Sequence, residues 1–153
     1  MLANVTLQRD LCFVEIIEGE TDALARQVNE SAFFADLGAA GIMLQSIDIG
    51  ALDCSLVARA ADAEALAAIA RNYNLAVKVR GTCGCVAAHR DQRDTPLPPL
   101  ASIIAVLHRK HIPIVHVVAT PNDLTLVVNW DQVGPAFAVV RRLLANRAQA
   151  AVA

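Results

Sequence analysis

Two cysteines and a histidine stand close together in the middle of the chain, at Cys83, Cys85 and His89. Residues two and six positions apart on a β-strand share a face, so both thiols and the imidazole would point the same way. Such a set could hold a soft metal ion, although structural zinc sites commonly place two to four residues between paired cysteines. The alternative is a pair of small buried cysteines in an alanine-rich strand. We expect the second arrangement, with no metal and no cofactor.

Three further histidines, His108, His111 and His116, could act as acids and bases or as a pH switch. His108 and His111 stand with Arg109 and Lys110 at the end of a predicted helix, where the helix dipole favours positive charge. No serine, cysteine or pair of carboxylates shows the pattern of a nucleophile with its base. No glycine-rich loop of the kind that holds phosphates is present. The sequence therefore predicts no catalytic residues.

The composition argues against two classes of partner. Hydrophobic residues make up 56% of the chain and charged residues 18%, with a mean hydropathy of +0.45 and a net charge of -2. Binding to nucleic acid needs a basic field that this balance does not supply. The apolar runs, such as 112–119, are far shorter than the roughly 20 residues that cross a bilayer, and residues 1–10 lack a secretory signal pattern. We therefore expect a cytoplasmic protein with reduced cysteines.

A series of landmarks occurs twice, about 70 residues apart. A helical pattern ends and a strand begins at 37–42 (LGAAGI) and again at 107–112 (LHRKHI). After each come a strand, a turn, a second strand and an acidic residue that opens a helix, Asp62 in the first half and Asp131 in the second. The constant interval indicates a duplicated unit, with one domain at residues 1–80 and the other at 81–153.

The first half predicts the order strand, helix, strand, strand, helix, strand. The expected elements are Leu11–Glu18, Ala23–Ala40, Ile42–Ile49, Leu52–Ala58, Asp62–Asn72 and Leu75–Val79. Thr21 or Asp22 would cap the first helix, and Gly38 and Gly41 would loosen its end. This order is that of the ferredoxin-like βαββαβ fold, an α+β architecture whose antiparallel sheet carries both helices on one face.

The second half repeats the order but lacks an obvious final strand. Its expected elements are Cys83–His89, Leu100–Lys110, Ile112–Ala119, Leu124–Asn129 and Asp131–Ala145. A polar, proline-bearing loop fills 90–99, and a turn at 120–123 joins the hairpin. Residues 3–8 could supply the missing strand, and the tail after Ala145 is expected to fray.

These patterns resemble the ACT domain family, and especially the tandem ACT pair at the C-terminus of aspartokinases. The segments at 37–42 and 106–114 are similar to that family's first helix end and second strand. Residues 120–128 are similar to its hairpin and third strand, and 131–144 to its closing helix. The resemblance covers about residues 10–146 and implies two ferredoxin-like (ACT) units that bind a small effector, with no kinase domain in this chain.

By this resemblance, a ligand site combines the loop and helix start of one unit with the second strand of an adjoining unit. A free amino acid needs donors or a cation for its carboxylate and acceptors for its ammonium group. The residues so implied are Glu20, Thr21, Asp22, Gln45 and Ser46 in the first unit, and Arg93, Asp94, Thr95, His116 and Asn122 in the second. The alternative is a pair of ordinary solvated loops, because neither 18–22 nor 90–99 keeps the family's usual proline–glycine pair.

The sequence thus favours a regulatory module of tandem ACT type that binds a small molecule, an amino acid by resemblance. Two alternatives remain open: an interaction or assembly module that has lost its ligand, and the regulatory subunit of an aspartokinase-like enzyme. We also expect a homodimer, because the high apolar content and the open strand edges need covering.

Overall fold

The computed structural model describes residues 4–17, 23–49, 54–89, 100–120 and 122–150, with the backbone alone for 23–30 and 147–150. The chain divides into two compact units by its internal contacts. We call Asp10–Thr82 the central unit, and Met1–Arg9 together with Cys83–Ala153 the terminal unit. Each unit is described by itself below. Among the described residues, no helix is long and apolar enough to span a membrane.

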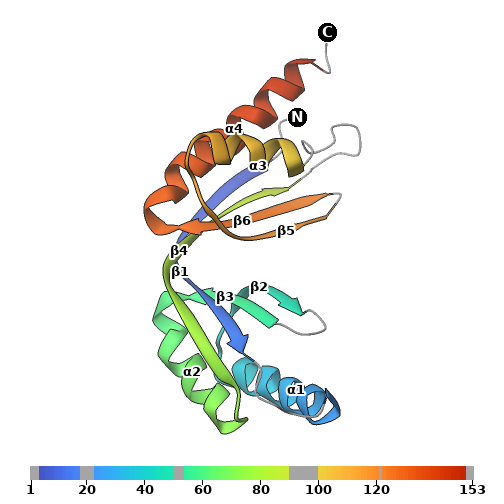
Figure 1. Ribbon diagram of the computed structural model, residues 1–153, viewed down its shortest axis with the longest axis vertical. Coiled ribbons are helices and arrows are strands. Elements are labelled where there is room, and N and C mark those ends of the chain that lie inside the picture. The colour runs from blue at the N-terminus through green and yellow to red at the C-terminus, as the bar shows by residue number, and fades with distance from the viewer. Residues whose placement is uncertain (1–3, 18–22, 50–53, 90–99, 121, 151–153) are drawn as a thin grey trace. The chain divides into compact units, whose positions relative to one another are not determined.

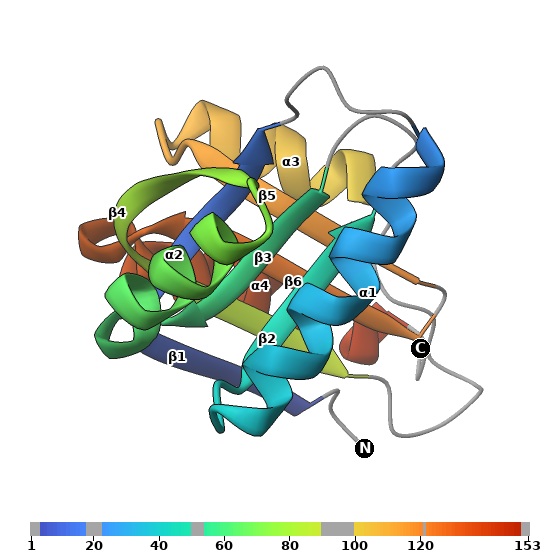
Figure 2. The same cartoon turned by 90° about the horizontal axis from the view of Figure 1, so that it is seen from below.

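The central unit follows the predicted order of strands and helices. Its elements are the later part of β1 (Asn4–Ile17), α1 (Ala23–Ala39), β2 (Leu44–Ile49), β3 (Cys54–Arg59), the short 3₁₀ helix η1 (Ala60–Asp62), α2 (Ala63–Asn72) and the first part of β4 (Ala76–His89). Strands β1 and β2 both pair antiparallel with β3. Helices α1 and α2 lie on the same face of these strands (Figures 1 and 2).

The terminal unit repeats this order. Its elements are the later part of β4, α3 (Leu100–Arg109), β5 (Ile114–Ala119), β6 (Asp123–Asn129), the 3₁₀ helix η2 (Trp130–Gln132), α4 (Val133–Ala150) and the start of β1. Strands β4 and β5 both pair antiparallel with β6, and α3 and α4 share one face (Figure 1). Helix α4 continues to Ala150, so the expected end of the helix at Ala145 is wrong.

Strands β1 and β4 are longer than the sequence patterns indicated. Each has 14 residues, and the two show the same pattern of burial along their length. The predicted strands at 75–79 and 83–89 are therefore parts of one strand, β4, which continues through Gly81. The start of β1 joins the terminal unit: Val5 packs against that unit's core, and the Gln8 carbonyl lies close to Gly84. Residues 4–9 thus occupy the place left open at the end of the second half.

Alternating apolar residues form one core under each helix pair. In the central unit, Val14 of β1 and Leu56 of β3 pack with Phe33 and Leu37 of α1 and with Leu66 of α2. In the terminal unit, the corresponding core residues are Val86, Ile103, Leu107, Leu126 and Val140. The described strands have the order β2-β3-β1-β4-β6-β5. The architecture is α+β with antiparallel strands, as in ACT-like folds, which confirms the predicted fold class at that level.

Three helices end in the same way, and this explains the landmarks in the sequence. A residue with positive φ follows each helix: Gly41 at 71° after α1, Asn74 at 55° after α2 and His111 at 54° after α3. The next N–H then reaches back to a carbonyl in the last turn, with N···O distances of 3.0 Å for Ile42 to Leu37 and 3.0 Å for Ile112 to Leu107. This is the hydrogen bond of the Schellman motif, in which an apolar contact joins the same residues.

The acidic residues that were expected to open helices act differently. Asp62 ends η1 and makes no side-chain cap to α2. Its carboxylate instead accepts two hydrogen bonds from the Arg59 guanidinium, at 2.7 and 3.1 Å. Asp131 lies inside η2, where its carboxylate accepts a hydrogen bond from the Gln132 side-chain amide at 3.0 Å. The predicted caps Thr21 and Asp22 lie outside the described residues.

Replacing His111 with glycine is expected to stabilise the protein. His111→Gly removes the steric cost of a left-handed conformation and should raise the free energy of unfolding by about 0.5–1 kcal/mol, measured by urea denaturation. The matched control is His108→Gly inside α3, which should lower it by about 1 kcal/mol. If His111→Gly lowers the free energy of unfolding as much as the control does, the imidazole makes contacts that outweigh the backbone strain.

Gly84→Ala is expected to destabilise the terminal unit. A Cβ at this position would stand 2.7 Å from both Cβ and Cγ2 of Val133 and 3.1 Å from the Gln8 carbonyl oxygen. Such overpacking costs about 1–3 kcal/mol of folding free energy. The control is Gly81→Ala in the same strand, where a Cβ meets nothing within 4 Å. Equal melting temperatures for the two variants would contradict the close packing of β4 on Val133 at the start of α4.

Candidate functional site

Six of the ten residues expected to bind ligand lie outside the described residues. They are Glu20, Thr21 and Asp22 in the first loop, and Arg93, Asp94 and Thr95 in the second. The other four are described. Gln45 and Ser46 lie on β2, His116 lies on β5, and Asn122 lies in the turn between β5 and β6.

Ser46 and His116 occupy matching places in the two units. The register of β2 against β3 shifts between Leu44 and Ser46, so Gln45 is an extra residue in that strand. The register of β5 against β6 shifts in the same way between Ile114 and His116. Such β-bulges redirect side chains and are common beside binding sites. After the bulges, Ser46 pairs with Val57 and His116 pairs with Val127.

Both side chains belong to the strand face that turns away from the helices. Leu56 and Ala58, on either side of Val57, pack into the core beneath α1 and α2, and Val57 is not part of that core. The same alternation holds in β6, where Val127 lies between core residues. Ser46 and His116 are half-buried, and the Nε2 atom of His116 is buried. A hydroxyl and an imidazole at these places can donate or accept hydrogen bonds to a polar ligand.

Asn122 belongs to a tight cluster at the hairpin turn. The Thr120 hydroxyl oxygen accepts hydrogen bonds from the N–H groups of Asn122, at 3.3 Å, and Asp123, at 3.0 Å. The Thr120 hydroxyl is also 3.2 Å from Oδ2 of Asp123. Oδ1 of Asp123 forms a hydrogen bond with Nδ1 of His89, at the end of β4. The cluster thus joins the hairpin turn to the last residue of β4.

The sequence interpretation missed the pair of His89 and Asp123. The hydrogen bond from His89, followed by that from Thr120, lowers the pKa of the Asp123 carboxyl, so its ionised form is favoured. The sequence pattern groups His89 only with the two cysteines, because all three lie on one strand. The signal that could have found the pair is strand register: His89 lies directly opposite Asp123 in the β4–β6 ladder.

The cysteines of β4 are buried, as the alternative to a metal site predicted. Cys83 is 3% exposed and Cys85 8%, whereas His89 is exposed and pairs with Asp123. Burial raises the pKa of Cys85 to about 11, so this thiol stays protonated near neutral pH and is a poor metal ligand or nucleophile. The described part of the chain holds no group of three or more side chains that could bind a metal ion.

Comparison with known proteins identifies solved structures that share this fold. No family model matches the chain, and no curated protein matches it. A structure of aspartokinase α and β subunits aligns with a TM-score of 0.75 and 12% identity, over 95% of this chain and 99% of that one. The ligand-free regulatory subunit of aspartate kinase from Thermus thermophilus aligns with a TM-score of 0.71 and 13% identity, over 93% of this chain and 97% of that one.

The same fold also occurs within a longer enzyme. E. coli aspartokinase III, in a structure with lysine and aspartate, aligns with a TM-score of 0.61 and 16% identity, over 95% of this chain and 33% of that one. Identities this low establish the fold and nothing further. The chain has, over nearly its whole length, the fold of the regulatory subunits and domains of aspartokinases, as the resemblance in its sequence predicted.

Proposed function

We propose that this chain is a cytoplasmic regulatory module of tandem ACT type that binds a free amino acid and carries no catalytic site. The two proposed βαββαβ repeats are residues 1–80 and 81–153, and residues 4–9 of the first repeat pack in the terminal unit. Corresponding strands begin about 70 residues apart, at Leu44 and Ile114 for the bulged strands. This recurrence supports a tandem repeat.

The observation that carries the proposal is the extent of the structural similarity. The regulatory subunit from Thermus thermophilus is covered almost completely, which supports a regulatory role for a chain of this length. The E. coli enzyme was solved with lysine and aspartate, which supports an amino acid as the effector. Regulation then follows from linkage, because a ligand that binds one arrangement of the module more tightly shifts the population toward it.

The matched bulges support a site at the second strand of each unit. An amino acid presents a carboxylate, which needs donors, and an ammonium group, which needs acceptors. The Ser46 hydroxyl and the His116 imidazole can supply either. We propose that the ligand contacts Gln45, Ser46 and residues 20–22 in the first unit, and His116, Asn122 and residues 93–95 in the second.

A thermal-shift screen of the common amino acids tests ligand binding, with lysine and aspartate first. A ligand at about 100 times its Kd adds about 2.7 kcal/mol to the stability of the folded state, which raises Tm by several degrees for a chain of this size. We expect at least one amino acid to do so at millimolar concentration. If none stabilises the folded protein, the module has lost its ligand and the assembly alternative replaces this proposal.

Substitutions at the bulges test the place of the site. Ser46→Ala and His116→Ala should each weaken binding of the identified amino acid about tenfold, because each removes a hydrogen bond to a charged group. Isothermal titration calorimetry gives the Kd values. The control is Ser31→Ala, at an exposed position on α1. Unchanged affinity in both bulge variants would place the ligand elsewhere.

Strand β2 supports the proposed homodimer. It lies at one end of the strand order and is therefore an open edge, and its residues Ile47 and Ile49 are 45% and 56% exposed, with Met43 beside them at 66%. An exposed apolar edge strand pairs readily with another chain.

Light scattering at micromolar concentration should therefore give about twice the chain mass of 16.3 kDa. Ile47→Lys should shift the mass toward the monomer, because a charge on an edge strand opposes pairing. Val79→Lys serves as the control, since Val79 is 41% exposed on β4, which lies inside the strand order. A wild-type mass of one chain would refute the dimer.

A further inference from the structure

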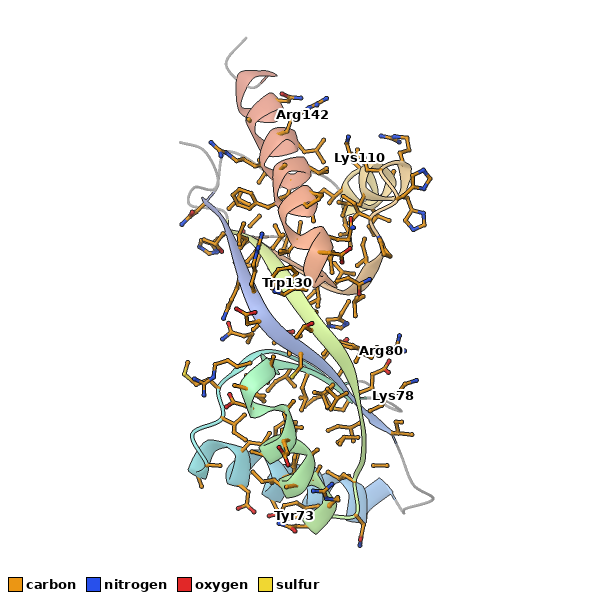
Figure 3. All side chains as sticks on the ribbon, turned by 90° about the vertical axis from the view of Figure 1, so that its left-hand side faces the viewer. Tyr73, Lys78, Arg80, Lys110, Trp130 and Arg142 are labelled. Carbon is orange, nitrogen blue, oxygen red and sulfur yellow. The ribbon has the colours of Figure 1, made fainter. Side chains whose placement is uncertain are left out.

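A groove runs along the outer side of the helix pair in the terminal unit. Its volume is about 630 Å³. Its lining residues are Val106, Arg109, Lys110, Pro135, Ala138, Val139, Arg142, Leu143 and Asn146. Five of these residues are apolar, and three are cationic: Arg109 and Lys110 at the end of α3, and Arg142 on α4. Figure 3 shows Lys110 just after the end of α3 and Arg142 on α4.

The ionisable side chains of the two helices that form this groove are all basic. Neither α3 nor α4 contains an aspartate or a glutamate. Helices α1 and α2 of the central unit contain both acidic and basic residues, and Asp36 and Glu64 are among the acidic ones. The chain's net charge of -2 therefore conceals a cationic helix layer in one unit. Such a layer attracts a partner of opposite charge.

The helix dipole accounts for only part of this charge. Arg109 and Lys110 lie at the C-terminus of α3, where a cation is favourable in any case. Arg142 lies in the middle of α4 (Val133–Ala150), more than one turn from either end, and the dipole gives no reason for a cation there. Its position in the lining brings a third charge to the groove from a second helix.

The shape of the groove favours a helix over a small molecule. The lining residues of α4, from Pro135 to Asn146, recur every three or four positions and so form one stripe about 16 Å long. All three cations are exposed, whereas small-molecule sites enclose most of the surface of their ligand. An elongated apolar stripe with a charged rim suits an amphipathic helix laid into a groove.

We infer that this groove docks an acidic amphipathic helix of a partner protein. Apolar side chains of that helix would cover Ala138, Val139 and Leu143, and its carboxylates would face Arg109, Lys110 and Arg142. The groove lies on the helix side of the terminal unit, whereas His116 belongs to the strand face that turns away from the helices. The inference therefore goes beyond amino-acid binding and does not rest on it.

Fluorescence anisotropy with a synthetic peptide tests this surface. The probe is a labelled helix of about 18 residues, with leucines at i, i+3, i+4 and i+7 and glutamates beside them. We expect saturable binding to the full chain that weakens as salt is raised, and no binding of the same peptide with lysines in place of glutamates. Arg142→Glu should weaken binding about tenfold, because it replaces an attraction with a repulsion.

The matched control is Arg141→Glu, on the same helix, exposed, and not part of the lining. It should change the affinity of the peptide less than threefold, and thermal melts of both variants check that each is folded. Equal losses in the two variants would overturn the inference, because general attraction to a basic helix would then explain the binding. Equal binding of the lysine peptide would overturn it too. Tripolyphosphate is added as a competitor, with sodium chloride at the same ionic strength as its control. If tripolyphosphate alone displaces the peptide, and Arg142→Glu prevents this, the groove binds a small polyanion instead.

Discussion

The sharing of β1 and β4 between two units is the constraint on which the rest of the structure depends. Each strand gives some residues to the central unit and the rest to the terminal unit. At the boundary in β1, Asp10 adopts a positive φ of 58°, an unusual conformation within a strand. Because residues 4–9 pack in the terminal unit, that unit is completed by a segment distant in sequence. Its assembly must therefore pay the entropy of closing a long loop.

Within each unit, the helix end sets where the second strand starts. The left-handed residues Gly41 and His111 turn the chain, and the next residues, Ile42 and Ile112, are buried in the same cores as the helices they follow. The bulge that follows then moves Ser46 and His116 onto the opposite strand face. The proposed ligand residues thus owe their position to backbone geometry at two nearby points, and their own polarity contributes little to it.

The two faces of the terminal unit differ in chemistry. Its strand face carries the half-buried His116, and the hairpin turn at its edge is held by Thr120, Asp123 and His89. Its helix face is apolar and cationic and lacks any carboxylate from α3 or α4. In the proposed regulatory module, the strand face would bind the small molecule and the helix face would contact the partner protein.

The sequence by itself determined the order of strands and helices, because apolar periodicity and turn residues are local properties. It also determined the recurring helix ends at 37–42 and 107–112, because both follow one backbone motif with its own residue pattern. The buried cysteines followed from their apolar surroundings. These features can be predicted without knowing which segments of the chain contact one another.

Only the tertiary structure decided how distant segments pair. The placing of residues 4–9 in the terminal unit, the joining of two predicted strands through Gly81 into one, and the partnership of His89 with Asp123 all depend on strand register. The groove depends on the packing of α3 beside α4, which brings Arg142 near Arg109 and Lys110. The physical reason is common to all of these: pairing and packing are non-local, whereas the sequence pattern records which face of an element is buried and not what buries it.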